Sequence, residues 1–188
     1  STSGCVGMAG NYTINPGGGG LPNFTSFANA ITALQACGVG GPVVFTVAAN
    51  TYAEQISMPL INGVSPTNTI TFDGGAGNAA TRIISLASGV TTAANPHVWR
   101  FNATQYVTLR NLTIRSNDAT NAWNVNFMNA QNCRLINCIV DNPSYGASSN
   151  SNVIGVVVNG SNTASTTISA VATNNYIDSN TISFGYYN

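Results

Sequence analysis

The sequence predicts an all-β solenoid, in which short coils of the chain stack on one another behind one short N-terminal α-helix. The main observation is an internal repeat: the segment 101–114 recurs at 127–140, an offset of 26 residues, with Phe101 matching Phe127 and Leu109 matching Leu135. Each copy consists of two runs with a period of two, which is typical of strands that bury one face. A unit of this length cannot bury its apolar face alone and has to stack on the next copy.

The residues between the two runs are the second observation. An Asn separates them in both copies, Asn111 and Asn137, and a weaker third unit at 176–182 contains Asn180. Because Asn tolerates the left-handed conformation, it can turn the chain there. We expect these three Asn to form a ladder at the turns, in which each side-chain amide bonds the backbone of the neighbouring coil.

Aliphatic residues stacked inside a strand, Asn turn, strand unit resemble the right-handed parallel β-helix, the pectate-lyase-like architecture. The resemblance implies an all-β, right-handed parallel β-helix with a short N-terminal capping α-helix. That fold carries lyases, hydrolases, phage tailspikes and adhesins, so it implies no particular activity. A β-sandwich with accidentally similar strands is the alternative fold.

The N-terminal part, taken in order, divides into an arm and a helix. Residues 1–22 form an arm, with a short extended run at 11–14 and a Gly-rich connector that lacks the Lys of a phosphate-binding loop. Within residues 23–38, apolar side chains at spacings of three and four predict an amphipathic helix over 25–36, and Gly38 ends it. We expect this helix to cover the first coil, since a bare end would expose core and strand edges.

Residues 39–188 are expected to form the coils of one β-helical domain. A polar excursion at 141–152 predicts a projecting loop, and no second amphipathic segment follows Ile182 to close the far end. We therefore expect the last coil to dock on further coils of the same chain or on another copy, head to tail. Strands are predicted by short apolar or alternating runs at 42–47, 56–58, 69–72, 83–86, 153–158, 166–171 and 176–182.

Residues 4–73 carry a second resemblance. The run Gly10 to Ile14, the helix, the run Gly41 to Val47 and the run Asn68 to Phe72 resemble the N-terminal region of large secreted surface proteins exported by the type IX secretion route. The resemblance implies an extracellular or cell-surface location and membership in a longer chain or assembly. It transfers no catalytic residue to this sequence.

The composition excludes two classes of partner. Only 5% of the residues are charged, no Lys is present, and five Arg balance five acids. Such a surface cannot neutralise nucleic-acid phosphates or bind anionic lipid, and no apolar run is long enough for membrane insertion. Abundant Asn, Thr and Ser, and an opening at Ser1 like that of a processed product, favour secretion.

The four cysteines form two groups. Cys5 and Cys37 flank the predicted helix region, and we expect a disulfide between them in an oxidising compartment. Cys133 and Cys138 match the core residues Val107 and Leu112 of the first copy and are expected to be buried thiols. A zinc site is the alternative, but no Cys-x-x-Cys pair exists and His97 is the one His. We expect no cofactor and no metal.

Few residues offer catalytic chemistry. The acids are scattered along the chain, and the plausible contributors are Asp118, Asp141, Arg115 and His97. In the 26-residue register Asp141 falls on Arg115, so we expect these two to form an ion pair between coils, which is more often structural than catalytic. Either Asp73 or Asp118 is a conceivable partner for His97.

Two function hypotheses follow. The first is a non-catalytic extracellular β-helix module, an adhesin segment, stalk or filament subunit with a neutral Asn/Thr/Ser-rich surface, with copies of itself and surface carbohydrate as partners. The second is a carbohydrate-active β-helix enzyme, either a lyase or a glycoside hydrolase. Aromatic residues are available to stack on sugar rings, although the two Trp are expected to pack inside the coils: Trp99, Trp123, Tyr106 and Tyr145.

Overall fold

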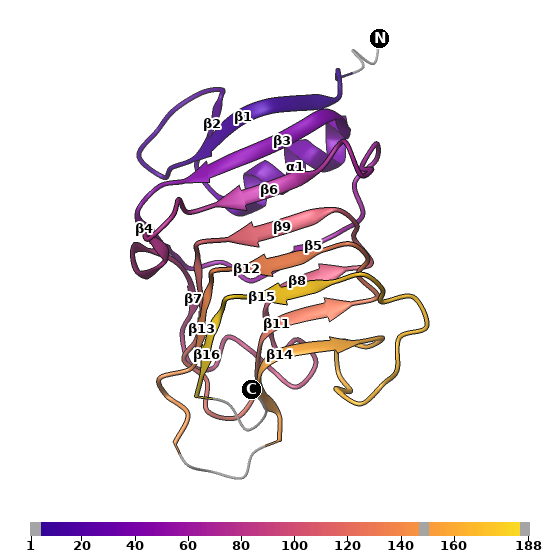
Figure 1. Ribbon diagram of the computed structural model, residues 1–188. Helices are drawn as coiled ribbons and strands as arrows, with labels where there is room; N and C mark the ends of the chain where they lie inside the picture. Colours follow the sequence, from indigo (N-terminus) through magenta and orange to yellow (C-terminus); the bar gives the residue numbers. More distant parts are fainter. Residues whose placement is uncertain (1–4, 147–150, 185–188) are drawn as a thin grey trace.

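The structure is a computed structural model that describes residues 5–146 and 151–184. It consists mostly of parallel β-sheet with one α-helix, as predicted for an all-β protein (Figure 1). Three sheets are present, and neighbouring strands are parallel in all of them. We refer to the seven-stranded sheet as sheet A, to the five-stranded sheet as sheet B and to the four-stranded sheet as sheet C.

Sheet A contains, in spatial order, β15 (Tyr176–Asp178), β12 (Arg134–Ile136), β9 (Val107–Arg110), β6 (Ile70–Asp73), β3 (Val39–Val47), β1 (Met8–Ile14) and β2 (Asn23–Phe24). Sheet B contains β16 (Thr181–Ser183), β13 (Ile139–Asp141), β10 (Thr113–Ser116), β7 (Arg82–Leu86) and β4 (Asn50–Tyr52). Sheet C contains β14 (Val153–Asn159), β11 (Ala122–Met128), β8 (His97–Asn102) and β5 (Ile56–Met58).

From β3 onward the chain visits sheets A, B and C in a constant order, and each pass forms one row of the stack. The rows are β3–β4–β5, β6–β7–β8, β9–β10–β11, β12–β13–β14 and the partial row β15–β16. The predicted repeat is confirmed, because its equivalent residues are direct partners: Phe101 with Phe127, Leu109 with Leu135 and Ile114 with Val140.

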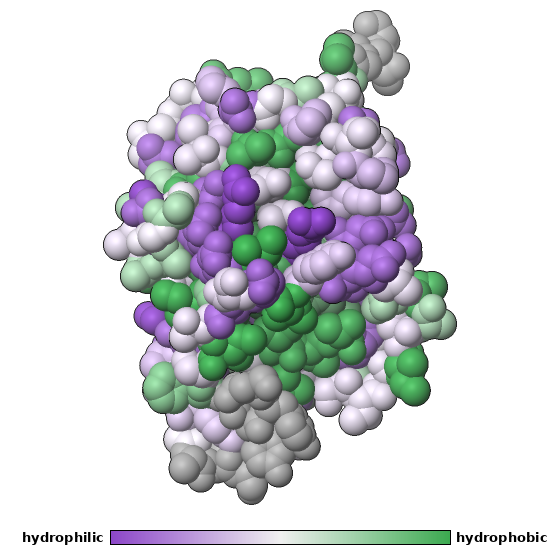
Figure 2. Space-filling model, in the orientation of Figure 1, coloured by the Kyte–Doolittle hydropathy of each residue, from purple (hydrophilic) through white to green (hydrophobic). Residues whose placement is uncertain are grey.

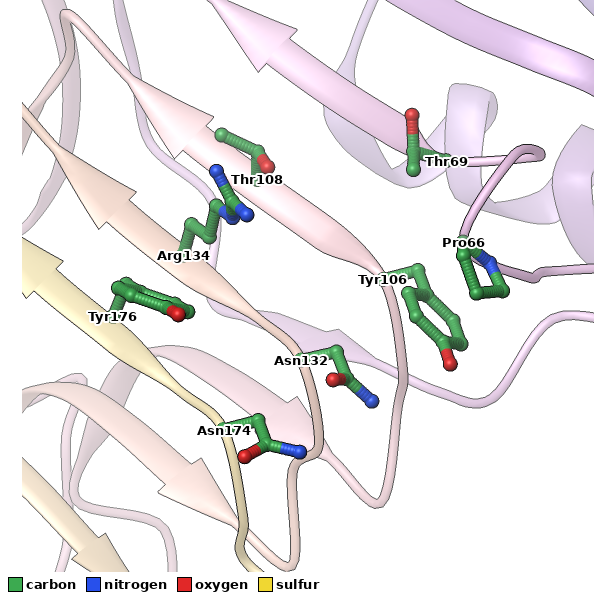
Figure 3. A pocket seen from close by; sticks show the side chains of 8 residues that line it. All are labelled: Pro66, Thr69, Tyr106, Thr108, Asn132, Arg134, Asn174 and Tyr176. Atoms are coloured by element: carbon green, nitrogen blue, oxygen red, sulfur yellow. The ribbon is translucent and has the colours of Figure 1, made fainter.

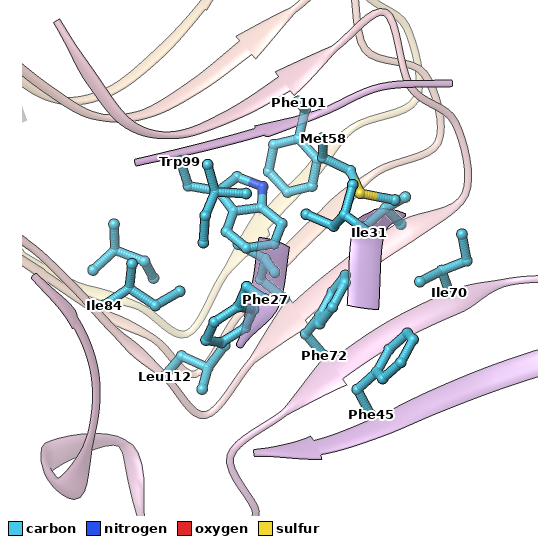
Figure 4. Packing of buried hydrophobic residues seen from close by; sticks show 14 of the residues in the cluster. Phe27, Ile31, Phe45, Met58, Ile70, Phe72, Ile84, Trp99, Phe101 and Leu112 are labelled. Atoms are coloured by element: carbon cyan, nitrogen blue, oxygen red, sulfur yellow. The ribbon is translucent and has the colours of Figure 1, made fainter. Parts of the chain in front are cut away.

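The core lies between the sheets and is built from columns of stacked apolar side chains. The rings of Phe45 and Phe72 stack with centroids 4.9 Å apart, and those of Phe101 and Phe127 with centroids 4.4 Å apart. Trp99 and Trp123 are buried, as expected. Phe27 joins the columns at the N-terminal end, where its ring contacts Tyr52, Phe72 and Trp99 (Figure 4).

The predicted helix is α1 (Phe27–Cys37). It begins after Ser26, whose hydroxyl accepts the backbone N–H of Asn29 and caps the first turn. The carboxylate of Glu54 also accepts the N–H groups of Phe27 and Ala28, at 3.1 and 2.8 Å. These groups have no partner within the helix, so Glu54 ties the start of α1 to the first row. Gly38 ends the helix with φ 64°, as the sequence indicated.

Two predictions about the strands were wrong. The arm 1–22 is not separate from the coils, because β1 is a strand of sheet A and pairs with β3 over most of its length. The segment 166–171 is not a strand, and Ile168 is 91% exposed. The hydroxyls of Ser161 and Ser169 accept backbone N–H groups two and three residues further on, and such local turns compete with strand pairing.

The turns after sheet A confirm part of the expected Asn ladder. Asn111 and Asn137 both have left-handed conformations, with φ of 57° and 51°, but the equivalent residue of the next row is Ser179, with φ 55°. Asn180 lies one position further on, at the position of the core residue Cys138. Its amide binds the backbone of the previous row, because its Oδ1 accepts the N–H of Cys138 and its Nδ2 donates to the carbonyl of Leu135.

The predicted disulfide joins Cys5 and Cys37. Cys133 and Cys138 are free and buried, and burial raises the pKa of their thiols to about 12 and about 11. Among the described residues, no helix is both long and apolar enough to cross a bilayer.

Candidate functional site

The expected pair of Arg115 and Asp141 forms on neighbouring strands of sheet B. Arg115 is on β10 and Asp141 on β13, and the guanidinium donates two parallel hydrogen bonds to the carboxylate, at 2.8 and 2.7 Å. Hydrogen bonding to Asp141 raises the pKa of Arg115. Both groups are therefore held as ions in a forked pair that links two rows.

Asp118 lies in the turn between β10 and β11 and acts as a turn former. Burial opposes its ionisation, but hydrogen bonds from the backbone N–H groups of Asn121 and Gly89, together with those of Thr120, lower its pKa to about 2. The side chain of Asn142 donates to its backbone carbonyl at 2.6 Å. A carboxylate with this low pKa is a poor general acid or base near neutral pH.

Asp118 is expected to make stability depend on pH in the acid range. Its pKa is lowered in the folded state, so its contribution is complete above the unfolded pKa near 4 and is lost as pH falls through about 2. Asp118→Asn should remove roughly 2 kcal/mol at pH 6 and much less at pH 2. Urea unfolding across this range measures the difference. The control is Asp178→Asn, an exposed carboxylate. A pH-independent difference would contradict the assignment.

His97 is not a partner of either acid. It lies at the start of β8 in sheet C and is buried, and its Nδ1 has no hydrogen-bond partner among the described residues. Burial, and then the nearby charge of Arg100, lower its pKa to about 3. Asp73, the other conceivable partner, is on sheet A. His97 is therefore a neutral core residue at neutral pH.

The remaining acids are also engaged in contacts that shape the fold. Asp73 binds Arg110 at 2.8 Å and accepts from the side chain of Asn111 and the backbone of Gly75. Glu54 holds the start of α1, and Asp178 accepts from the hydroxyl of Ser179. No cluster of three or more His, Cys, Asp or Glu suited to a metal occurs within residues 5–146 and 151–184.

The outer face of sheet A offers a more open arrangement. Strands β6, β9, β12 and β15 lie side by side in register, so their outward residues form a grid. This face contains a groove of about 450 Å³ (Figure 3), which we call the sheet A groove. Its lining is polar and aromatic: Pro66, Thr69, Tyr106, Thr108, Asn132, Arg134, Asn174 and Tyr176.

One side of the groove is built from three left-handed residues. Tyr106, Asn132 and Asn174 precede β9, β12 and β15 at equivalent positions, with φ of 55°, 54° and 55°. This repeated turn places a phenol ring and two amides in one line along the stack, as Figure 3 shows. Amides and hydroxyls aligned beside an aromatic ring can bind polar, ring-shaped ligands.

The middle of the groove contains a cation stacked on an aromatic ring. The guanidinium carbon of Arg134 lies 4.9 Å from the centre of the Tyr176 ring, and both side chains are exposed. Arg134 forms no ion pair with any described carboxylate. A second hollow of about 450 Å³ shares Thr108 and Arg134 with the groove and extends it toward the Asp73–Arg110 pair.

The sequence analysis named Tyr106 but missed the groove. It is formed by residues from four rows, and Arg134 and Tyr176 are partners although they are 42 positions apart. The available signal was the outward position of alternate residues in each strand, combined with the register. Tyr145, also named, lies in the loop after β13 and does not line the groove.

Comparison with known proteins adds no relative: no family model, no curated protein and no solved structure matches the chain.

Proposed function

We propose that this chain is a non-catalytic, extracellular right-handed parallel β-helix module that binds surface carbohydrate in the sheet A groove. The constant order of the three sheets supports the β-helix, because a chain that returns to each sheet one row later traces a helical path. Parallel crossovers are almost always right-handed, which supports the hand.

The use of the acids supports a binding role over catalysis. Sugar-cleaving enzymes need carboxylates that are free to transfer protons, attack carbon or bind Ca²⁺. Here the carboxylates of Glu54, Asp73, Asp118 and Asp141 accept hydrogen bonds that fix a helix end, turns and neighbouring rows. This is the observation that carries the non-catalytic part of the proposal.

An extracellular location is supported by the disulfide and by the surface. Disulfides persist in oxidising compartments, and Cys5–Cys37 is formed. The surface is nearly uncharged and rich in Asn, Thr and Ser, so it interacts with neutral ligands and little with polyanions. The resemblance to type IX secreted surface proteins points in the same direction.

Carbohydrate is the ligand class that best fits the groove. A sugar presents hydroxyls for amides and a C–H face for an aromatic ring, and Tyr106, Asn132 and Asn174 supply both kinds of contact in one line. A groove open along the stack accommodates a chain of sugars. We therefore infer that the groove binds an oligosaccharide of the cell surface or its surroundings.

A glycan array followed by calorimetry tests the proposal. Wild type should bind a set of oligosaccharides, and Tyr106→Ala or Asn132→Ala should weaken binding at least tenfold. The matched control is Tyr145→Ala, which leaves the groove intact. No binding on the array, or equal binding by all variants, would refute the glycan site. Release of new reducing ends from any bound polysaccharide would refute the non-catalytic role.

A further inference from the structure

Exposed apolar side chains gather at the two ends of the stack. Val6 and Leu21 lie beside the first strands of sheet A, while Leu60 and Val90 are the large exposed apolar residues elsewhere in the described ranges. Figure 2 shows hydrophobic surface on the C-terminal half of this face. The members at the C-terminal end are Val158, Ile168, Val171, Tyr176, Ile177 and Phe184.

One core column connects the two ends. Its C-terminal member, Ile177, is 43% exposed, although its partner Leu135 in the previous row is fully buried. At the N-terminal end the column begins with Tyr12, which is partly buried and contacts Phe24. From end to end the column consists of Tyr12, Phe45, Phe72, Leu109, Leu135 and Ile177.

Sheet A also has a free edge at each end (Figure 1). No described strand follows β15. At the other edge, β2 pairs with β1 only at Thr13 and Ile14, so the stretch 8–12 of β1 has no strand on its outer side. The strands of sheet A are parallel, so β1 of one molecule continues the direction of β15 of another when the stacks share an axis.

We propose that a second copy of this chain docks head to tail, with its β1 edge on the β15 edge of the first. The contact extends sheet A across the junction and places Tyr12 of one copy over Ile177 of the other, which continues the core column. The formal net charge of zero means that little repulsion opposes the contact. A head-to-tail contact leaves both outer ends available, so it propagates into filaments.

The inference rests on the proposed stacked module and is independent of its glycan site. A two-fold, tail-to-tail contact is the competing arrangement and would stop at a dimer. The two arrangements differ in their need for the N-terminal end, because only the head-to-tail contact uses residues beside β1 and β2. Variants at opposite ends of the stack therefore separate them.

Sedimentation velocity over a concentration series tests the proposal with two variants. Ile177→Lys places a charge on the tail, and Leu21→Lys places one beside β2, where Leu21 is 75% exposed. Wild type should form a series of species that grows with concentration, and each variant alone should be monomeric. An equal mixture should form dimers only, because one sound head meets one sound tail. The control, Leu60→Lys, should assemble like wild type.

Three results would overturn the proposal. Monomeric wild type at all concentrations would show that the ends do not bind each other. Dimers of Leu21→Lys alone would indicate the tail-to-tail contact, and assembly of Ile177→Lys would show that the tail is not used. Circular dichroism melts check that both variants fold. Failure of the glycan assay leaves these outcomes unchanged, so the two proposals fail separately.

Discussion

Replacing Phe27 with Ala is expected to lower the free energy of unfolding by about 3–5 kcal/mol. Phe27 is fully buried, and its ring contacts Tyr52, Phe72 and Trp99 at centroid distances between 5.1 and 5.9 Å. Removing the ring leaves a cavity between α1 and the first two rows, which the stacked columns cannot close. Urea denaturation monitored by Trp fluorescence and circular dichroism measures the loss.

The matched control for this prediction is Phe184→Ala. The same atoms are removed there, but Phe184 is 56% exposed, so the change should stay within about 0.5 kcal/mol when protein is dilute. Equal losses for the two variants would mean that α1 does not anchor the N-terminal end.

Removing the disulfide is expected to cost about 3–4 kcal/mol. Cys5 and Cys37 are 32 positions apart, and cross-linking them restricts the unfolded chain. Cys5→Ser with Cys37→Ser should therefore lower the unfolding free energy by this amount, as measured by urea denaturation. Val6→Ser is the control, because it changes an exposed neighbour in the same segment.

Thiol counting checks the assignment that underlies this prediction. Denatured, unreduced protein should label two thiols, those of Cys133 and Cys138. In native protein at pH 8 both should react slowly, since burial raises their pKa values to about 12 and about 11 and keeps them protonated. Four labelled thiols after denaturation would contradict the disulfide.

The sequence predicted whatever depends on one constant offset. The repeat at 26 residues placed Asp141 against Arg115 and put Cys133 and Cys138 at the core positions of Val107 and Leu112. Both are confirmed because the two rows have equal length, so each residue meets its counterpart. The local helix pattern likewise predicted α1, with Ser26 and Gly38 at its ends.

Predictions failed where the offset changes or where the partner is distant in sequence. Between β12 and β15 the offset is 42, because the loop around β14 is longer, so Ser179 takes the turn position and Asn180 faces the core. The run 8–14 gave no sign that it pairs with β3, since short strands look alike whichever sheet they join. The sheet A groove was missed for the same reason, because four rows contribute to it.

The one-sided attachment of the last row has a mechanical consequence. β15 and β16 pair only with β12 and β13, whereas the N-terminal end is tied to α1 through the Cys5–Cys37 bond. A pulling force on the ends should peel rows from the C-terminal side, one after another. Each 42-residue segment released would lengthen the chain by about 140–150 Å, and each 26-residue segment by about 90 Å. Under tension the stack would thus yield in steps from its tail, while the clamped end resists longest.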